Sequence, residues 1–247
     1  MKNIGILFTA SMKNNFTSKS VAIIWYGLTL LLAAGMIVLF GILLIGPEVE
    51  KLTPDRSRLE LYLGVTMFSV SLIGLGVNLN ALGFTSMIRE KAKGNIQSLL
   101  VTNLNIKDIW LGKTLSVFLP GLIVGTVLTA ATLLVLNFVY FVPNIGFIIN
   151  PWIAITSFVT YPALYFCMGL LVYLIGLTNK PVNANIIAQV FLPVFINLVI
   201  QLMLRTSFMD YTSWQFMLVN LGFVIIVGLI VLVRAPRISK EKVVLSY

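Results

Sequence analysis

Gly112-Lys113-Thr114 matches the end of a phosphate-binding loop, the element that holds nucleotide phosphates in many ATPases. Such a loop also needs a glycine five residues before its second glycine, on a turn that follows a strand. Lys107 occupies that position, and an apolar run follows Thr114, so we expect no nucleotide site on this chain. The chain has no histidine and one cysteine, Cys167, which excludes the usual zinc, haem and iron–sulfur ligand sets and any serine–histidine triad. We predict that it is not an enzyme and binds no cofactor or metal ion itself.

The segment 88–113 concentrates charge next to apolar residues. Its charges come first, at Arg89, Glu90, Lys91 and Lys93, and its apolar group follows, at Ile96, Leu99 and Leu100. A short helix held at a bilayer surface would present these charges to a soluble partner. The alternative is a solvated loop whose lysines only set the membrane topology.

Among the polar side chains within the apolar runs, six are of interest: Asn78, Asn80, Tyr161, Tyr165, Asn197 and Gln201. A polar amide facing lipid is costly, so we expect these side chains to point inward. Asn197 and Gln201 are four residues apart and share one helical face. The six residues are candidates for a translocation path. The alternative is hydrogen bonding between helices, worth about 0.6–2 kcal/mol for each bond.

Helices that cross a membrane must position these residues. The chain is 59% hydrophobic and 10% charged, whereas soluble domains carry about 25% charged residues. A helix that crosses the hydrocarbon core needs about 20 apolar residues. Uncharged runs of this kind occupy 21–45, 61–87, 115–136, 152–177, 186–204 and 215–233, with a proline- and asparagine-rich break at 137–151. We therefore predict an all-α integral membrane protein with six transmembrane helices.

The basic residues predict the orientation. With a cytoplasmic N-terminus, that side holds all of the 17 lysines and arginines except Lys51, Arg56, Arg58 and Arg205. The positive-inside rule then places both ends in the cytoplasm. We expect the chain to be a multi-pass protein of the cell membrane. The net charge of +9 follows from this topology, so we expect no nucleic-acid partner. The predicted spans contain no ionisable residue of the kind that proton-driven carriers and voltage sensors use.

Several features outside or at the ends of the spans carry further predictions. Residues 1–20 place Ile4, Leu7, Phe8, Met12 and Phe16 on one helical face, which predicts an amphipathic helix in the inner interface; the alternative is a frayed polar leader. Residues 234–247 are predicted to form a basic cytoplasmic tail. We expect Lys113 to be an interfacial anchor and Gly121 and Gly125 to form a close-packing motif. Aromatic belts are expected at Trp25, Trp110, Trp152 and Trp214.

The segment after the second run resembles that of permease subunits of type-2 ATP-binding-cassette exporters. Their motif, Glu-Arg/Lys-x-x-Gly-Thr-Leu-Glu-x-Leu-Leu-x-Thr-Pro, is followed by Gly-Lys at the third span. The matching residues here are Glu90, Lys91, Gly94, Leu99, Leu100, Thr102, Gly112 and Lys113. This chain departs from the motif at Asn95, Gln97 and Asn103. The six runs, the N-terminal amphipathic segment and the length extend the resemblance over the whole chain.

The resemblance implies half of a transporter. A second permease, identical or related, and two cytoplasmic ATPase subunits that bind ATP and Mg²⁺ would complete it. A coupling helix would dock on the ATPase, with polar contacts from Arg89, Glu90 and Lys91, a turn at Gly94, apolar anchors at Leu99 and Leu100, and Thr102 at its end. Family members often have a re-entrant hairpin between the last two spans, which would here fall near 200–216.

Two other functions remain open at this point. The chain could be a membrane scaffold or sensor that recruits a soluble partner without transport, or an ATP-independent channel or carrier. The absence of charged residues in the spans favours an amphipathic or lipid-like cargo over a bare ion. The sequence identifies neither the cargo nor the pairing of the permease.

Overall fold

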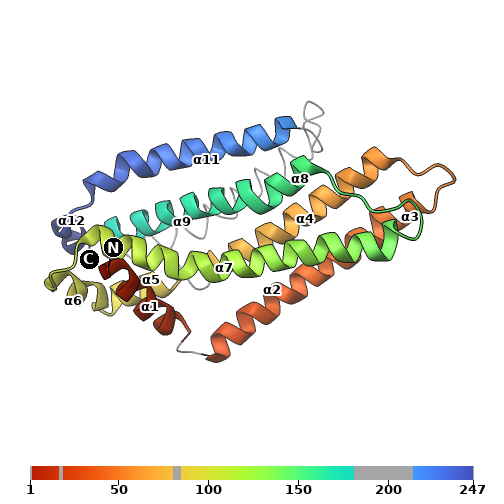
Figure 1. Ribbon diagram of the computed structural model, residues 1–247. Coiled ribbons are helices and arrows are strands. Elements are labelled where there is room, and N and C mark those ends of the chain that lie inside the picture. Colours follow the sequence, from red (N-terminus) through yellow and green to blue (C-terminus); the bar gives the residue numbers. More distant parts are fainter. Residues whose placement is uncertain (1, 17–18, 80–84, 181–213, 247) are drawn as a thin grey trace.

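The computed structural model describes residues 2–16, 19–79, 85–180 and 214–246, and in these ranges the chain is helical, without a strand. The long helices are α2 (Lys19–Phe40), α4 (Arg56–Asn78), α7 (Ile106–Leu136), α9 (Tyr161–Thr178) and α11 (Trp214–Arg234). They run side by side along one bundle, and the two chain ends lie together at one end of it (Figure 1). We call this the terminal end, and the other the distal end.

Five helical stretches in the described ranges are long and apolar enough to cross a membrane, which confirms a multi-pass membrane protein. They are Ala22–Val49, Arg56–Val77, Ile106–Phe141, Pro151–Thr178 and Trp214–Arg237. The predicted run 186–204, like the region 200–213 where a re-entrant piece was considered, lies outside the described residues. Each of the other five predicted runs corresponds to one of these helical stretches.

One helix boundary differs from the predicted one because a capping residue decides it. The third long helix begins at Ile106 rather than near Leu115, since Asn105 caps it by accepting a hydrogen bond from the Lys107 backbone N–H at 3.1 Å. The second run was expected to continue to Met87. The structure describes α4 as far as Asn78 and places Met87 in the helix α5 (Thr85–Ala92), while residues 80–84 between them lie outside the described residues.

The predicted break at 137–151 is confirmed at the distal end. A π-helical turn, η3 (Asn137–Phe141), follows α7, and the chain then turns through Gly146, whose φ is +90°. The buried Asn137 amide holds the turn: its oxygen accepts from the Ile148 N–H at 2.7 Å. Asn150 then caps α8 (Pro151–Ile155), which continues through η4 (Thr156–Thr160) into α9.

Helices α4 and α7 pack closely because glycines face each other. A Cβ added to Gly74 would lie 2.8 Å from the Gly125 Cα, and one added to Gly125 would lie 3.0 Å from Leu75 Cγ. Gly125, from the close-packing motif, therefore does lie at a helix–helix contact. Helix α2 packs against α4 and also contacts α7, so that Ala33, Val70 and Leu128 form one cluster. It continues through η1 (Gly41–Ile45) into α3 (Gly46–Val49) and exposes many aliphatic side chains.

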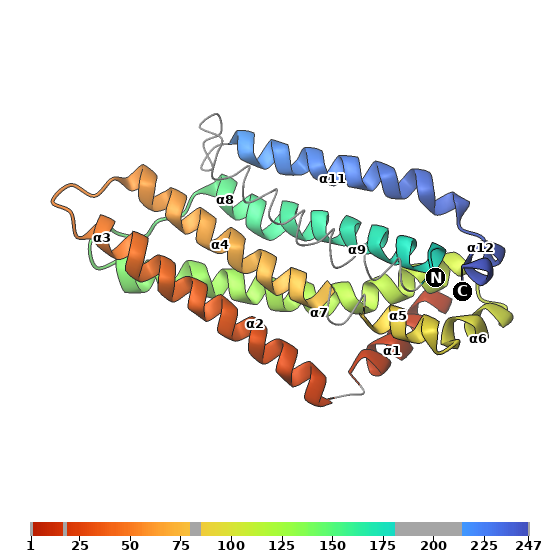
Figure 2. The same ribbon diagram turned by 180° about the vertical axis from the view of Figure 1, so that it is seen from behind.

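Both chain ends form short helices at the terminal end. The N-terminal helix α1 (Lys2–Asn15) packs on α7, where Leu7 is buried against Gly112. The expected basic tail is instead folded: α11 is followed by a single 3-10 turn, η5 (Ala235–Arg237), and by α12 (Lys240–Leu245). The short helices α5 and α6 (Asn95–Val101) lie beside them (Figure 2).

Candidate functional site

The segment expected to couple to a partner forms two helices joined at a tight turn. Helix α5 ends at Ala92, and Gly94 adopts φ +74°, a left-handed conformation that favours glycine. Its N–H donates to the Lys91 carbonyl at 3.0 Å. At the far end of α6 the Thr102 hydroxyl donates to the Leu99 carbonyl at 2.6 Å and so closes the helix. Gly94 therefore makes the expected turn, while its part in coupling stays a prediction.

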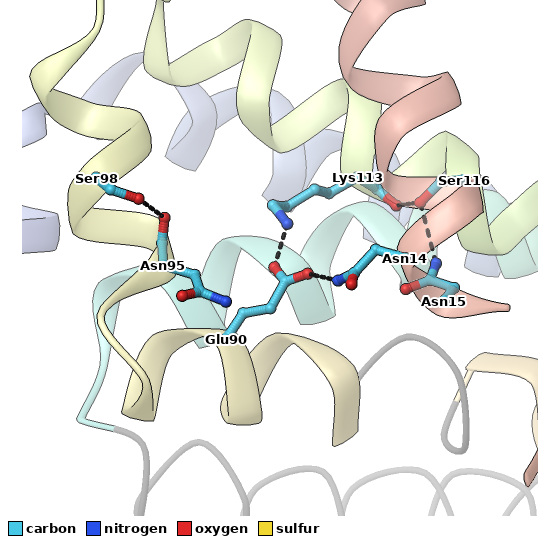
Figure 3. A network of polar contacts seen from close by, with 7 residues as sticks. All are labelled: Asn14, Asn15, Glu90, Asn95, Ser98, Lys113 and Ser116. Carbon is cyan, nitrogen blue, oxygen red and sulfur yellow. Dashed lines mark hydrogen bonds and ion pairs between the residues drawn. The ribbon is translucent and has the colours of Figure 1, made fainter. Parts of the chain in front are cut away.

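Glu90 connects α5 to two other helices. Its carboxylate forms an ion pair with Lys113 of α7 and accepts a hydrogen bond from the Asn14 amide of α1 at 2.6 Å (Figure 3). A second link between α1 and α7 lies next to it, where the Asn15 amide donates to the Ser116 hydroxyl at 3.3 Å. Lys113 is thus buried and paired, and the expectation that it anchors the chain in the lipid interface was wrong.

Lys91 connects α5 to the end of α9 and to the C-terminal segment. Only 1% of the residue is exposed, and its Nζ donates to the carbonyls of Gly176 (3.3 Å), Leu177 (3.0 Å) and Asn179 (2.5 Å) and to the Ser246 hydroxyl (2.6 Å). Carbonyls at the end of a helix carry partial negative charge and favour a nearby cation. Burial opposes this and lowers the pKa of Lys91 to about 8.

These contacts change the roles expected for the charged residues. Glu90 and Lys91 were predicted to contact a partner, but their side chains are buried and bonded within the chain, where they fix α5 to the bundle. Arg89 and Lys93 are the exposed charges of this stretch. The cause is helical spacing: neighbouring residues on a helix point in different directions, so a run of charges divides between an inner and an outer face.

The apolar residues of α6 divide in the same way. Ile96 and Leu100 are buried in the core of the terminal end, and Leu99 is half-buried against it. Leu99 and Leu100, predicted as anchors to a partner, therefore anchor α6 to the bundle. Val101 is 88% exposed and is the apolar residue that α6 presents outward, next to the exposed Thr102.

Of the candidate translocation-path residues, the structure describes the side chains of Tyr161 and Tyr165, one turn apart on α9. Both are buried. The Tyr165 hydroxyl accepts from the Leu79 N–H at 2.9 Å and joins α9 to the end of α4, as expected of a polar group that connects helices. Tyr161 packs edge-on against Phe68, with ring centroids 4.1 Å apart. Its hydroxyl has no hydrogen-bond partner among the described residues.

The remaining candidates, the side chain of Asn78 and the residues Asn80, Asn197 and Gln201, lie outside what the structure describes. Of the six candidates, the structure therefore places two, Tyr161 and Tyr165 on α9, and a common path stays a prediction. Of the four tryptophans expected at the interfaces, Trp25, Trp152 and Trp214 are partly exposed. Trp110 is not: it is buried, and its Nε1 donates to the Leu170 carbonyl at 2.9 Å.

The sequence reasoning missed three contributors to this site: Asn14, Lys240 and Ser246. They come from the two chain ends, which we expected to be an interfacial helix and a tail. Lys240 Nζ donates to the carbonyls of Leu100 (3.0 Å) and Thr102 (2.9 Å) and so caps α6. The available signal was Ser239, a capping residue followed by Lys240-Glu241-Lys242-Val243-Val244-Leu245, which is typical of a short helix.

No protein-family model, curated protein or solved structure matches this chain. Among the described residues, no three histidine, cysteine, aspartate or glutamate side chains are grouped so that they could hold a metal ion. The geometry of the terminal end is therefore the basis on which a function can be proposed.

Proposed function

We propose that this chain is the membrane subunit of an ATP-driven exporter and transmits movement from a separate cytoplasmic ATPase to the bundle. One observation supports the proposal most directly: α5 and α6 form a compact unit whose inner face is bonded to α1, α7 and α9. Among the described residues, its outer face is exposed at Arg89 and Lys93. Glu90 and Lys91 fix α5 to α1, α7 and α9. A push on α5 would therefore displace these helices together, as the rigid-body mechanism of such transporters requires.

The charge distribution supports a cytoplasmic location for the terminal end. Its exposed charges in the described ranges are mostly basic, at Lys13, Arg89, Lys93, Lys107, Lys180, Arg234, Arg237, Lys240 and Lys242. The positive-inside rule associates such an excess with the cytoplasm. In our proposal both chain ends lie there, and α1 lies in the inner interface of the cell membrane.

The directions of the long helices support a sixth span. Helix α9 ends at the terminal end, whereas α11 begins at the distal end (Figure 1). The chain between them must connect opposite ends of the bundle, and it contains the apolar run 186–204. We propose that this run crosses the membrane, and that a second permease and two ATPase subunits, which bind ATP and Mg²⁺, complete the transporter.

Co-purification tests the proposal. The chain, tagged at its N-terminus because Ser246 is buried near the other end, is extracted in mild detergent and its partners are identified by mass spectrometry. A stoichiometric subunit with a phosphate-binding loop is expected, together with any second permease. Recovery of a soluble protein without an ATPase domain would instead make the chain a scaffold or sensor. Robust transport by the purified chain alone would make it a channel or carrier.

Outward-facing variants test the coupling surface. Arg89→Glu and Lys93→Glu together should reduce the ATPase retained by at least tenfold, because both side chains are exposed and lie on the proposed docking face. The matched control is Arg56→Glu with Arg58→Glu, also exposed but at the distal end, which should retain the ATPase fully. Equal retention by both pairs would exclude α5 as a docking element.

A further inference from the structure

Helices α6 and α12 enclose an open groove of about 590 Å³ at the terminal end. Its apolar lining comes from Leu100 and Val101 of α6 and from Val244 and Leu245 of α12. Its polar lining residues are Gln97, Lys240 and Glu241. Leu245 is 81% exposed and Val101 is 88% exposed, so the two helices present apolar side chains on either side of the same opening.

The C-terminal helix is fixed in place by contacts at both of its ends. Lys240 donates to two carbonyls at the end of α6, and the Ser246 hydroxyl donates to the Leu177 carbonyl at 3.0 Å and accepts from Lys91. Between them Val243 is fully buried in the core. The side of the groove that α12 forms is thus part of the folded unit that contains α5, α6 and the end of α9.

We infer that α12 forms the second side of the docking site for the soluble ATPase subunit, and that the groove between α6 and α12 receives an apolar side chain of that subunit. The inference rests on the proposed function and extends the proposed docking site from α5 and α6 to α12. The first argument is position. Both helices lie at the terminal end, beside the two chain ends and beyond the long helices (Figures 1 and 2). In the proposed topology, exposed apolar residues there lie on the cytoplasmic side of the bundle rather than in the hydrocarbon core.

The second argument is charge. The groove itself is lined by one lysine, Lys240, and one acid, Glu241. The described helices and turn near it at the terminal end also expose Arg89, Lys93, Arg237 and Lys242. A partner with acidic residues around a protruding apolar side chain would match this surface in both respects. Anionic lipid headgroups share the charge but offer no apolar side chain to a groove on the aqueous side, so we assign the groove to the protein partner.

The binding test uses the full chain in neutral-lipid nanodiscs and the ATPase subunit that co-purifies with it. Leu245→Asp and Val101→Asp should each weaken the binding of the ATPase at least tenfold. Both side chains are exposed, so the fold should persist, and the thermal unfolding midpoint of each variant checks this. The matched control is Leu52→Asp, which alters a fully exposed leucine in the loop after α3 and should bind like the unaltered chain.

The outcomes separate the inference from the proposed function. If Val101→Asp weakens binding and Leu245→Asp does not, α12 is no part of the site and the inference is overturned, while the proposed function stands. If the unaltered chain retains no ATPase, the proposed function fails and the inference fails with it.

A fluorescent label distinguishes the lipid alternative. Leu245→Cys in a Cys167→Ala background leaves one thiol for an environment-sensitive dye, because Cys167 is the chain's single cysteine. A blue shift on addition of the ATPase, and none on replacing neutral by anionic lipid, supports the inference. A blue shift with anionic lipid alone would assign the groove to the membrane surface and overturn it.

Discussion

At the residue scale, the buried charges of Lys91 and Lys113 are compensated by different kinds of group. Lys113 is matched by a full negative charge, the Glu90 carboxylate. The described partners of Lys91 are three carbonyl oxygens and a hydroxyl. A carboxylate compensates a buried ammonium directly, whereas carbonyl dipoles do so partially. The two lysines should therefore respond differently to mutation and to pH.

Breaking the buried ion pair should strongly destabilise the terminal end. Glu90→Gln or Lys113→Met alone leaves one buried charge without its partner, which typically costs about 3–5 kcal/mol. The double variant Glu90→Gln with Lys113→Met removes both charges and should recover much of the loss. Denaturant unfolding in detergent, followed by tryptophan fluorescence, measures the three free energies. Additive losses in the double variant would contradict a direct interaction.

Stability should rise with pH above about 8 because of Lys91. Its pKa is about 8 in the folded protein, against an ordinary value of 10.5. Between these two pH values the unfolded chain binds a proton that the folded chain has released, so raising the pH favours folding. The gain in the free energy of unfolding is complete above pH 10.5 and is lost as the pH falls through 8. The unfolding midpoint of the unaltered chain should rise relative to that of Lys91→Met across this window. Parallel pH profiles would contradict the assignment.

The sequence predicts which residues of this region are charged but not where their side chains point. Glu90 and Lys113 are 23 positions apart, and Lys91 and Ser246 are 155 positions apart. Contacts over such distances follow from packing, which no local pattern encodes. Asn78, Asn80, Asn197 and Gln201 stay predictions, whereas Tyr165 is explained by its hydrogen bond to α4.

At the scale of the element, hydropathy predicts the long helices well, because about 20 uncharged apolar residues have few alternatives to a membrane helix. It predicts their ends poorly. Asn105 extends α7 beyond its apolar part, and α5 contains both the last residues of the second apolar run and the charged residues Arg89, Glu90 and Lys91. Capping residues and short amphipathic helices are not hydrophobic enough to be detected as long apolar runs.

The close contact between α4 and α7 should not tolerate a larger residue. Gly74→Ala would place a Cβ 2.8 Å from the Gly125 Cα, a backbone atom that cannot move alone, so the helices must separate. Such overpacking costs about 1–3 kcal/mol. The matched control is Gly222→Ala in α11, where a Cβ would meet nothing within 4 Å. The control should be neutral or slightly stabilising, since alanine favours a helix over glycine. Thermal unfolding of both variants in detergent distinguishes them, and equal midpoints would contradict the close contact.

At the scale of the whole molecule, the bundle has two unlike ends. The distal end is closed by short turns around Asn137 and Asn150, whereas the terminal end gathers four short helices, α1, α5, α6 and α12. Elements remote in sequence also meet at the distal end, where the Asn150 amide donates to the Glu60 carboxylate at 3.0 Å. Hydropathy predicts the bundle, but the assembly of these helices depends on long-range contacts that it does not describe.

Thiol labelling of cells should distinguish the two ends. In a Cys167→Ala background, Leu52→Cys should react with a membrane-impermeant maleimide added outside, because this residue is fully exposed at the distal end. Lys93→Cys, exposed at the terminal end, should react only after permeabilisation. The reverse pattern would invert the proposed orientation.

The contacts of Ser246 and Lys240 also set an order of events during synthesis. Lys91 leaves the ribosome 155 residues before Ser246, and Leu100 leaves it 140 residues before Lys240. At about 5–20 residues per second, α5 and α6 wait roughly 10–30 s for the segment that completes them. A chain whose translation stops early would insert its first helices but lack one side of the proposed docking groove. Under the proposed function such a chain would bind the ATPase more weakly, so incomplete copies would be kept out of the assembled transporter.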